Sequence, residues 1–317
     1  MSVGELSGGD LLSSEGASNA VYGLPPPELA ERRSDARQLS PLVPGAGAIE
    51  GLDDASLPGM TILAPPGTIE RRYVLAHALR TVKAGGQIVV LAPRDKGGAR
   101  LRRELEGFGC RVAEDARRHH RICRTTRPRD PVGLAAAIDA GAPRRVPALG
   151  MWSQPGVFSW DRLDPGTALL LETLPALDGA GADLGCGIGV LARAALASPT
   201  VTRLALVDID RRAVEAARRN IADPRAAFVH ADVRTPAAAQ SGLDFVIMNP
   251  PFHDAGREDR ALGQAFIAAA AAMLAKGGVC RMVANVALPY EQALIAHFPR
   301  VALVARARGY KVYEAGR

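Results

Sequence analysis

Asp183-Leu-Gly-Cys-Gly-Ile-Gly-Val190 is the most informative segment of this 317-residue chain. It stands between a short apolar run and an Ala-rich helical pattern, and its alternate glycines let a ligand approach bare backbone. A dinucleotide-binding loop would read G-x-G-x-x-G, which requires glycine where Val190 stands. The segment therefore predicts a nucleotide-type ligand at a strand-to-helix turn and argues against a pyrophosphate.

Two acids follow the next two predicted strands. Asp208 stands where a carboxylate would accept both ribose hydroxyls, and Asp232 would lie beside the exocyclic amine of an adenine, with Val233 against its ring. Because carboxylates repel phosphate, this set suits an adenosine that carries a cationic tail. The expected contacts from the loop itself are Asp183, Gly185, Gly187 and Gly189.

Strand and helix patterns alternate along most of the chain. Residues 203–207 are rich in strand-forming side chains and precede a helical pattern at 213–220. Residues 243–248 are of the same kind and precede a helical pattern at 262–274. A strand followed by a helix, repeated, predicts an α/β fold in which helices cover both faces of a parallel sheet.

An internal repeat indicates two copies of one unit. Met60-Thr-Ile-Leu-Ala-Pro-Pro66 parallels Phe245-Val-Ile-Met-Asn-Pro-Pro251, and each is followed by a helical pattern and a Gly-Gly strand. The first copy has Ala64 where the second has Asn249, and no Gly-rich loop precedes residue 60. We predict a duplicated domain whose first copy has lost its chemistry.

With these features the second half resembles the class I S-adenosylmethionine-dependent methyltransferases. The resemblance implies that the Gly-rich loop holds the amino-acid part of the cofactor and that Asp208 holds the ribose. It also implies that Asn249-Pro-Pro-Phe252, which the cofactor is expected to contact through Asn249, binds a planar nitrogen to be methylated.

The proposed chemistry suits these residues. An exocyclic amine is a poor nucleophile because its lone pair is delocalised, so its two N–H groups must be held by acceptors, here the Asn249 side-chain oxygen and the Pro250 carbonyl. Pro251 would fix the turn and Phe252 would stack on the base. Transfer would be a direct in-line displacement, after which His253, Asp254 or water receives the proton.

Further segments narrow the resemblance to the bacterial small-subunit rRNA guanine-N2 methyltransferases and their large-subunit relatives. They are residues 155–159, 163–171, 249–253, 283–285, 288–290 and 310–313. The family implies two tandem Rossmann-like domains, the N-terminal one degenerate, and a guanine of 16S or 23S rRNA as the target. We expect a flexible tail over 1–18, a degenerate RNA-positioning domain over 19–148 and a catalytic domain over 149–317.

Basic residues concentrate in one stretch of the first copy. Residues 94–129 hold twelve basic and five acidic residues, an excess larger than the formal net charge of +6 for the whole chain. Arg117, Arg118 and Arg121 are therefore expected to contact RNA, as are Phe252, His253 and Lys311 in the second copy. The alternative for the basic stretch is a solvated helix face with ion pairs such as Arg102 with Glu106.

Composition limits the remaining possibilities. Hydrophobic residues make up 48% of the chain, enough for two cores, and the four cysteines form no C-x-x-C pair that would indicate a disulfide framework or a zinc site. The longest apolar run, 265–275, is too short for a bilayer, which takes about 18 residues. We expect a cytoplasmic monomer without a metal, whose partner is rRNA or a ribosomal subunit.

Two other functions remain open on sequence grounds. Asn-Pro-Pro-aromatic motifs serve several planar amines, so the methyl acceptor could be a protein glutamine or a DNA adenine. A non-catalytic rRNA-binding assembly factor with the same fold would be expected to show a damaged Gly-rich loop or Asn-Pro-Pro-Phe motif, and both are intact here.

Overall fold

The computed structural model consists of two compact units. The N-terminal unit comprises the described residues of 1–40 and 46–140, and the C-terminal unit comprises 41–45 and 141–317. The residues that the structure describes are 20–30, 34–235, 238, 240–251, 253–254, 257–258 and 260–317. The sequence gives no sign that the short loop 41–45 groups with the second unit, where the Arg211 N–H donates to the Pro41 carbonyl at 2.9 Å.

The C-terminal unit is built on a seven-stranded sheet with the order β11-β10-β9-β12-β15-β17-β16. Its strands are β9 (Gly179–Leu184), β10 (Val201–Asp208), β11 (Ala226–His230), β12 (Leu243–Met248), β15 (Leu274–Asn285), β16 (Arg300–Ala307) and β17 (Tyr310–Gly316). The first five in this order are parallel, and β17 pairs antiparallel with both β15 and β16. The chain proceeds outward from β9 in one direction and returns to β12 on its other side, which creates a switch point between β9 and β12.

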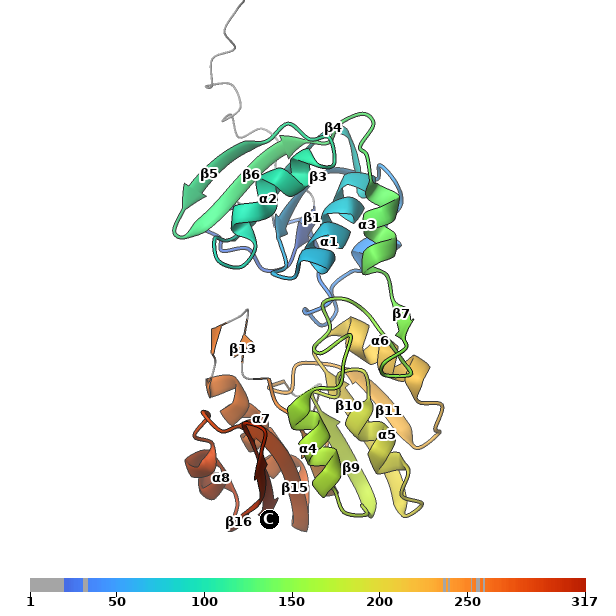
Figure 1. Ribbon diagram of the computed structural model, residues 1–317, viewed down its shortest axis with the longest axis vertical. Helices are drawn as coiled ribbons and strands as arrows, with labels where there is room; N and C mark the ends of the chain where they lie inside the picture. Colours follow the sequence, from blue (N-terminus) through green and yellow to red (C-terminus); the bar gives the residue numbers. More distant parts are fainter. Residues whose placement is uncertain are drawn as a thin grey trace, which may run out of the picture. The chain divides into compact units, whose positions relative to one another are not determined.

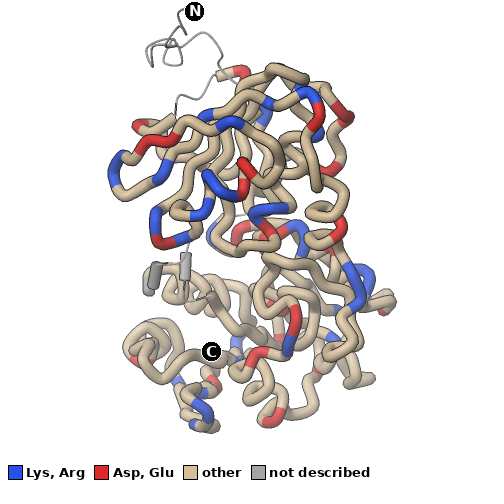
Figure 2. Tube along the Cα trace, turned by 45° about the horizontal axis from the view of Figure 1, so that its top comes forward, with Lys and Arg blue, Asp and Glu red and all other residues tan. Residues whose placement is uncertain are grey.

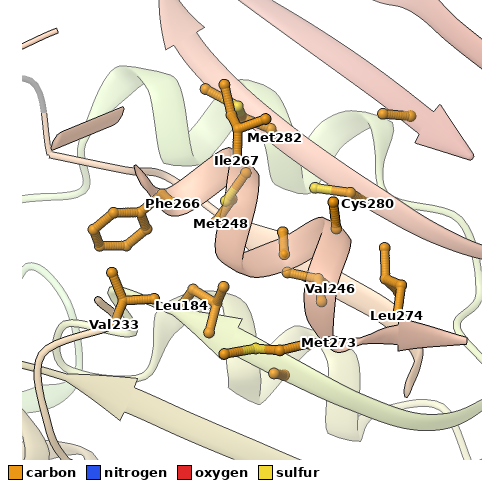
Figure 3. Close-up of a cluster of buried hydrophobic side chains, with 14 of the residues drawn as sticks. Leu184, Val233, Val246, Met248, Phe266, Ile267, Met273, Leu274, Cys280 and Met282 are labelled. Carbon is orange, nitrogen blue, oxygen red and sulfur yellow. The ribbon is translucent and has the colours of Figure 1, made fainter. Parts of the chain in front are cut away.

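Helices cover both faces of this sheet (Figure 1). They are α4 (Pro165–Thr173), α5 (Val190–Leu196), α6 (Arg211–Asn220), α7 (Arg260–Met273) and α8 (Glu291–His297). Alternate residues of β12 point to opposite faces: Phe245 and Ile247 pack with α4, α5 and α6, whereas Val246 and Met248 pack with α7 and α8 (Figure 3). This double burial explains why β12 is almost continuously apolar.

The N-terminal unit has a six-stranded sheet with the order β2-β1-β3-β4-β6-β5. Its elements are β1 (Ala20–Tyr22), β2 (Arg37–Leu39), β3 (Leu57–Leu63), α1 (Thr68–Thr81), β4 (Val82–Pro93), α2 (Leu101–Glu106), β5 (Ala113–Arg117), β6 (His120–Thr126) and α3 (Leu134–Gly141). Its main core joins α1, α2 and α3 to the strands, and among the described residues a smaller cluster of Leu29, Leu91 and Ile122 is buried apart from it. The described part of this unit is therefore packed mainly on one face.

The two sheets repeat one arrangement. The run β3-β4-β6-β5 matches β12-β15-β17-β16 in order and direction, parallel first and antiparallel afterwards. The Gly-Gly strands also pack alike: a Cβ at Gly86 would lie 2.4 Å from the Pro58 carbonyl oxygen, and one at Gly278 would lie 2.7 Å from that of Leu243. The predicted fold, two tandem Rossmann-like domains, is confirmed.

Several smaller predictions meet the structure at this level. The strand and helix patterns at 203–207, 213–220, 243–248 and 262–274 correspond to β10, α6, β12 and α7. The alternative of a solvated helix face holds within 94–129 only for α2, where the exposed Arg102 and Glu106 pair at 2.8 Å, whereas residues 113–126 form the antiparallel hairpin of β5 and β6. Among the described residues, no helix combines the length and apolar character needed to cross a bilayer.

Candidate active site

The Gly-rich loop leaves the carboxyl end of β9 at the switch point of the sheet, where α/β folds place their ligands. Gly185, Gly187 and Gly189 all have positive φ, at +70°, +52° and +90°. A Cβ at Gly187 would meet no atom within 4 Å, whereas one at Gly185 would lie 3.9 Å from the Asn249 carbonyl oxygen. The loop therefore presents open backbone at Gly187 and runs beside the Asn-Pro-Pro turn.

Asp183 is a buried carboxyl group at the base of this loop. Its side chain has no solvent exposure, and neither oxygen has a hydrogen-bond partner among the described residues. Burial first, and the negative charge of Asp208 second, raise its pKa to about 8. A buried carboxyl group without a partner is costly, so Asp183 suits a cationic ligand group that would pair with it.

Asp208 stands at the end of β10 with both oxygens oriented by backbone. Oδ2 accepts the Gly187 N–H at 2.8 Å and Oδ1 accepts the Asp210 N–H at 2.8 Å. Burial raises the pKa of Asp208 to about 6. The neighbouring acid is engaged elsewhere, because Asp210 caps α6 and binds the buried Arg212 guanidinium through two bonds of 3.0 and 2.8 Å. Of these two acids, Asp208 is the one next to the loop.

Asp232 and Val233 follow β11. The Asp232 carboxylate receives the Arg234 guanidinium at 2.6–3.0 Å, which lowers its pKa. Val233 is buried and points toward Phe266 and Leu184 in the core cluster (Figure 3). The position after β11 is thus an apolar wall with one paired carboxylate at its rim.

Asn249 follows β12 and is held by two side chains that sequence reasoning missed. Its Nδ2 lies 2.9 Å from Asp164 Oδ2 and 2.9 Å from Thr167 Oγ1, so the amide donates both N–H groups to the start of α4. The sequence signal for this position was the Asp-Pro pair, since Asp is a preferred N-cap and Pro a preferred first helical residue. The signal indicates a helix start but says nothing about a partner 85 residues away.

The rest of the motif is only partly described. Pro250 is buried and Pro251 is exposed. Phe252 lies outside the described residues, and for His253 and Asp254 the structure gives backbone alone, in the short strand β13 (His253–Asp254). Lys311 on β17 forms an ion pair of 2.6 Å with Glu291 and is largely buried, so its predicted contact with RNA stays a prediction.

The cysteines and the groups of metal-ligating side chains were the other candidates for chemistry among the described residues. The four cysteines are buried thiols, and burial raises the pKa of Cys186 in the loop well above its ordinary value. Within the described ranges, no group of three or more His, Cys, Asp or Glu side chains could hold a metal ion.

The predicted RNA-contacting arginines lie on the hairpin of β5 and β6 in the N-terminal unit. Together with Arg94 and the two histidines of the turn, they line a cavity of about 180 Å³. Arg118 pairs with Glu28 at 3.1 Å and Arg121 with Glu114 at 3.5 Å, and acidic segments alternate with basic ones in this part of the unit (Figure 2). The hairpin is basic without being uniformly charged.

The first copy has an occupied counterpart of the Asn249 turn. After β3 the chain reads Ala64-Pro-Pro66, and the Arg71 guanidinium donates to the carbonyls of Pro65 and Pro66 at 3.2 and 2.7 Å. Arg71 is fully buried and forms a bidentate pair with Glu104, with both bonds at 2.7 Å. A planar N–H group of the protein itself therefore occupies the carbonyls of this turn.

Comparisons with known proteins agree on one family. The family model described as methyltransferase small domain matches residues 148–314. Ribosomal RNA small subunit methyltransferase C of Pseudomonas fluorescens is 34% identical over 81% of this chain and 78% of its own, and the protein of the same name from Klebsiella pneumoniae is 31% identical over 88% and 81%. Among solved structures, a T. thermophilus 16S rRNA N2 methyltransferase in complex with AdoMet and guanosine superposes with a TM-score of 0.77 at 23% identity, over 96% of this chain and 90% of that one.

Proposed function

This chain belongs to the family of ribosomal RNA small subunit methyltransferases C. We propose that it transfers a methyl group from S-adenosylmethionine to the exocyclic N2 of a guanine in rRNA, with 16S rRNA as the expected substrate. The observation that carries this function is the orientation of the Asn249 amide, whose donors are both used inside the protein. Its oxygen is then the atom available to accept an N–H from a base.

The residues at the switch point suit the cofactor. S-adenosylmethionine, when bound, supplies an electrophilic methyl group on a positively charged sulfur. Asp183, buried and without a partner, would pair with the cofactor's ammonium group, and Asp208 would accept the ribose hydroxyls. The loop of Gly185, Gly187 and Gly189, whose backbone is open at Gly187, would follow the amino-acid part, while Asp232 and Val233 would contact the adenine.

The residues after β12 would prepare the target amine. Asn249 Oδ1 and the Pro250 carbonyl would each accept one N–H, which orients the nitrogen and favours its pyramidal form. The Pro-Pro turn restricts the backbone, and Phe252 would stack on the base. No covalent enzyme intermediate is required, and the buried, protonated Cys186 thiol is unsuited to form one. His253, Asp254 or water would take up the proton.

Other functions receive less support. The relatives that cover most of this chain carry the rRNA name, which disfavours a protein glutamine or a DNA adenine as the acceptor. Hydrogen bonds orient both the loop backbone and the Asn249 amide. A non-catalytic assembly factor would have no need for such an oriented site. We propose a cytoplasmic monomer that acts on rRNA or a ribosomal subunit.

The test of the function is the modification itself. Cells that lack the protein should have one N2-methylguanine fewer in their rRNA, and the purified protein with S-adenosylmethionine should restore it in subunits or rRNA from those cells. An unchanged methylguanine map would contradict the proposed function.

The hairpin of β5 and β6 is proposed to position the RNA. Changing Arg117, Arg118 and Arg121 to Glu should weaken RNA binding about tenfold or more and flatten its salt dependence, while cofactor affinity stays unchanged. The matched control carries the same charge change at Arg203, Arg300 and Arg306, which are exposed on the C-terminal unit. Equal losses in both triple variants would show that net charge, rather than the hairpin, governs binding.

A further inference from the structure

The hydrogen bonds of Asn249 determine which way its amide faces. Nδ2 lies 2.9 Å from a carboxylate oxygen of Asp164, and an ionised carboxylate can only accept, so the nitrogen must be on that side. The second N–H points to Thr167 Oγ1 at 2.9 Å. With both donors used, Oδ1 is fixed on the opposite side, and among the described residues it makes no hydrogen bond.

The two partners of Asn249 are themselves held rigidly. Asp164 and Thr167 are each only 8% exposed. Asp164 is the N-cap of α4, and the Oδ2 atom that accepts from Asn249 also accepts the Thr167 N–H at 2.8 Å. A Cβ at Gly166 would come within 2.7 Å of the Tyr310 ring, so the first turn of α4 packs closely against β17. One oxygen thus fixes both the helix terminus and the amide.

We propose that Asp164 and Thr167 are positioning residues for methyl transfer, which act through Asn249 by holding its oxygen toward the target amine. The proposal rests on the function proposed above. An amide rotated by 180° would present its own N–H groups to the N–H groups of the base, and donors cannot bond donors. The pair therefore leaves the Asn249 oxygen to accept an N–H of an amine. A base with a carbonyl oxygen at the same position would be repelled by that oxygen.

The orientation matters more for the chemical step than for binding. A base can still bind through stacking and phosphate contacts when one acceptor is turned away, but its amine is then not aligned for transfer. Small losses of alignment can cost about 100-fold in rate. Disturbing the pair should accordingly lower kcat far more than it raises KM.

The decisive variant is Asp164→Ser. Serine is as good an N-cap as aspartate, so it can still accept the Thr167 N–H, but its side chain is one atom shorter and cannot also reach Asn249. We expect kcat for guanine methylation to fall about 100-fold, with KM for RNA, cofactor affinity and melting temperature close to wild type. Asp164→Asn, whose side-chain oxygen can accept from both donors, should retain activity within a few-fold.

Thr167→Val tests the second partner independently of the cap. It removes one acceptor at nearly constant volume and should lower kcat about tenfold. Thr173→Val is the matched control, because Thr173 lies at the other end of α4 and donates only to the carbonyls of Leu169 and Leu170. That variant should keep the wild-type kcat.

The outcomes separate this inference from the proposed function. If the wild-type protein methylates guanine N2 and both Asp164→Ser and Thr167→Val have the same kcat as the wild type, the positioning role is overturned. The proposed function would then still stand. Equal losses in Thr167→Val and Thr173→Val would also overturn it, because they would point to a general effect on α4. A wild-type protein that methylates no guanine would overturn the proposed function itself.

Discussion

The two Pro-Pro turns of this chain follow equivalent strands but differ in which of their polar atoms are hydrogen-bonded within the protein. After β12, Asn249 uses its donors internally and leaves its oxygen to a ligand. After β3, Ala64 has no such group, and the carbonyls of Pro65 and Pro66 are occupied by the Arg71 guanidinium. The same turn is thus an acceptor site in one copy and a filled, internally bonded site in the other.

The difference shows how a site can be lost while its fold is kept. Carbonyl groups that lose contact with water need hydrogen-bond donors. Where no ligand binds, a side chain of the protein has to supply these donors. Arg71 and its partner Glu104 supply that replacement in the N-terminal unit, and Gly97 leaves room for the guanidinium, since a Cβ there would lie 2.2 Å from Arg71 Nη1. The guanidinium that fills this turn is thus fully buried, although Pro66 itself is exposed.

The largest effect is expected from emptying the filled turn. Arg71→Met leaves Glu104 buried without a partner and should lower the free energy of unfolding of the N-terminal unit by about 3–5 kcal/mol, as measured by urea unfolding. Adding Glu104→Leu should recover part of this loss, because it removes the unpaired charge. A stable Arg71→Met protein would show that the guanidinium is dispensable, and the contrast between the turns would weaken.

Removing the acceptor from the active turn should abolish most turnover. Asn249→Ala should reduce guanine methylation by about 100- to 1000-fold, the range seen when one oriented polar group is removed from a reaction centre. S-adenosylmethionine binding, followed by calorimetry, should persist. Ala64→Asn in the first copy serves as the counterpart and should neither add activity nor rescue Asn249→Ala.

The two copies also differ in the cofactor site, because the first has no Gly-rich loop and the second has one beside Asp208. Asp208→Ala should weaken S-adenosylmethionine binding about 10- to 100-fold, because it removes charged hydrogen bonds of about 1.5–3 kcal/mol. Asp178→Ala, at an exposed position just before β9, is the control for loss of one negative charge. Unaltered affinity in Asp208→Ala would mean that another carboxylate holds the ribose.

The last expected effect is a pH dependence of stability that arises from Asp183 on β9, whose counterpart at the end of β1 is Tyr22, a residue without a carboxyl group. Burial raises the pKa of Asp183 from 3.8 to about 8. The folded state therefore binds this proton more tightly than the unfolded chain, and stability falls as pH rises from about 4 to about 8. Asp183→Asn removes this titration, so its melting temperature should exceed that of the wild type by more at pH 8 than at pH 5.

Saturating cofactor is the control for that experiment. An ammonium group paired with Asp183 would favour the ionised carboxylate, so S-adenosylmethionine should stabilise the wild type more than Asp183→Asn at pH 8. If, without cofactor, the melting temperatures of Asp183→Asn and the wild type differ by the same amount at pH 5 and pH 8, ionisation of the buried Asp183 does not affect stability.

Local patterns were sufficient for most of the architecture. The alternation of apolar strands with helical runs predicted β10, α6, β12 and α7, and the repeated Pro-Pro and Gly-Gly segments predicted the tandem domains. These features could be predicted because strand period, glycine and proline act on the backbone within a few residues. Contact of the basic stretch over 94–129 with RNA stays a prediction, and the hairpin that residues 113–126 form within it was not predicted.

The sequence by itself determined the fold, the family resemblance and the order of the polar residues after each strand, because these depend on local composition and spacing. Only the tertiary structure decided their partners: Asn249 with Asp164 across 85 residues, and Arg71 with Glu104 across 33. Such pairs form where packing brings distant strands and helix ends together, and neither local propensity nor periodicity encodes that proximity. The direction of one amide group, and hence the kind of base it can accept, is decided at that level.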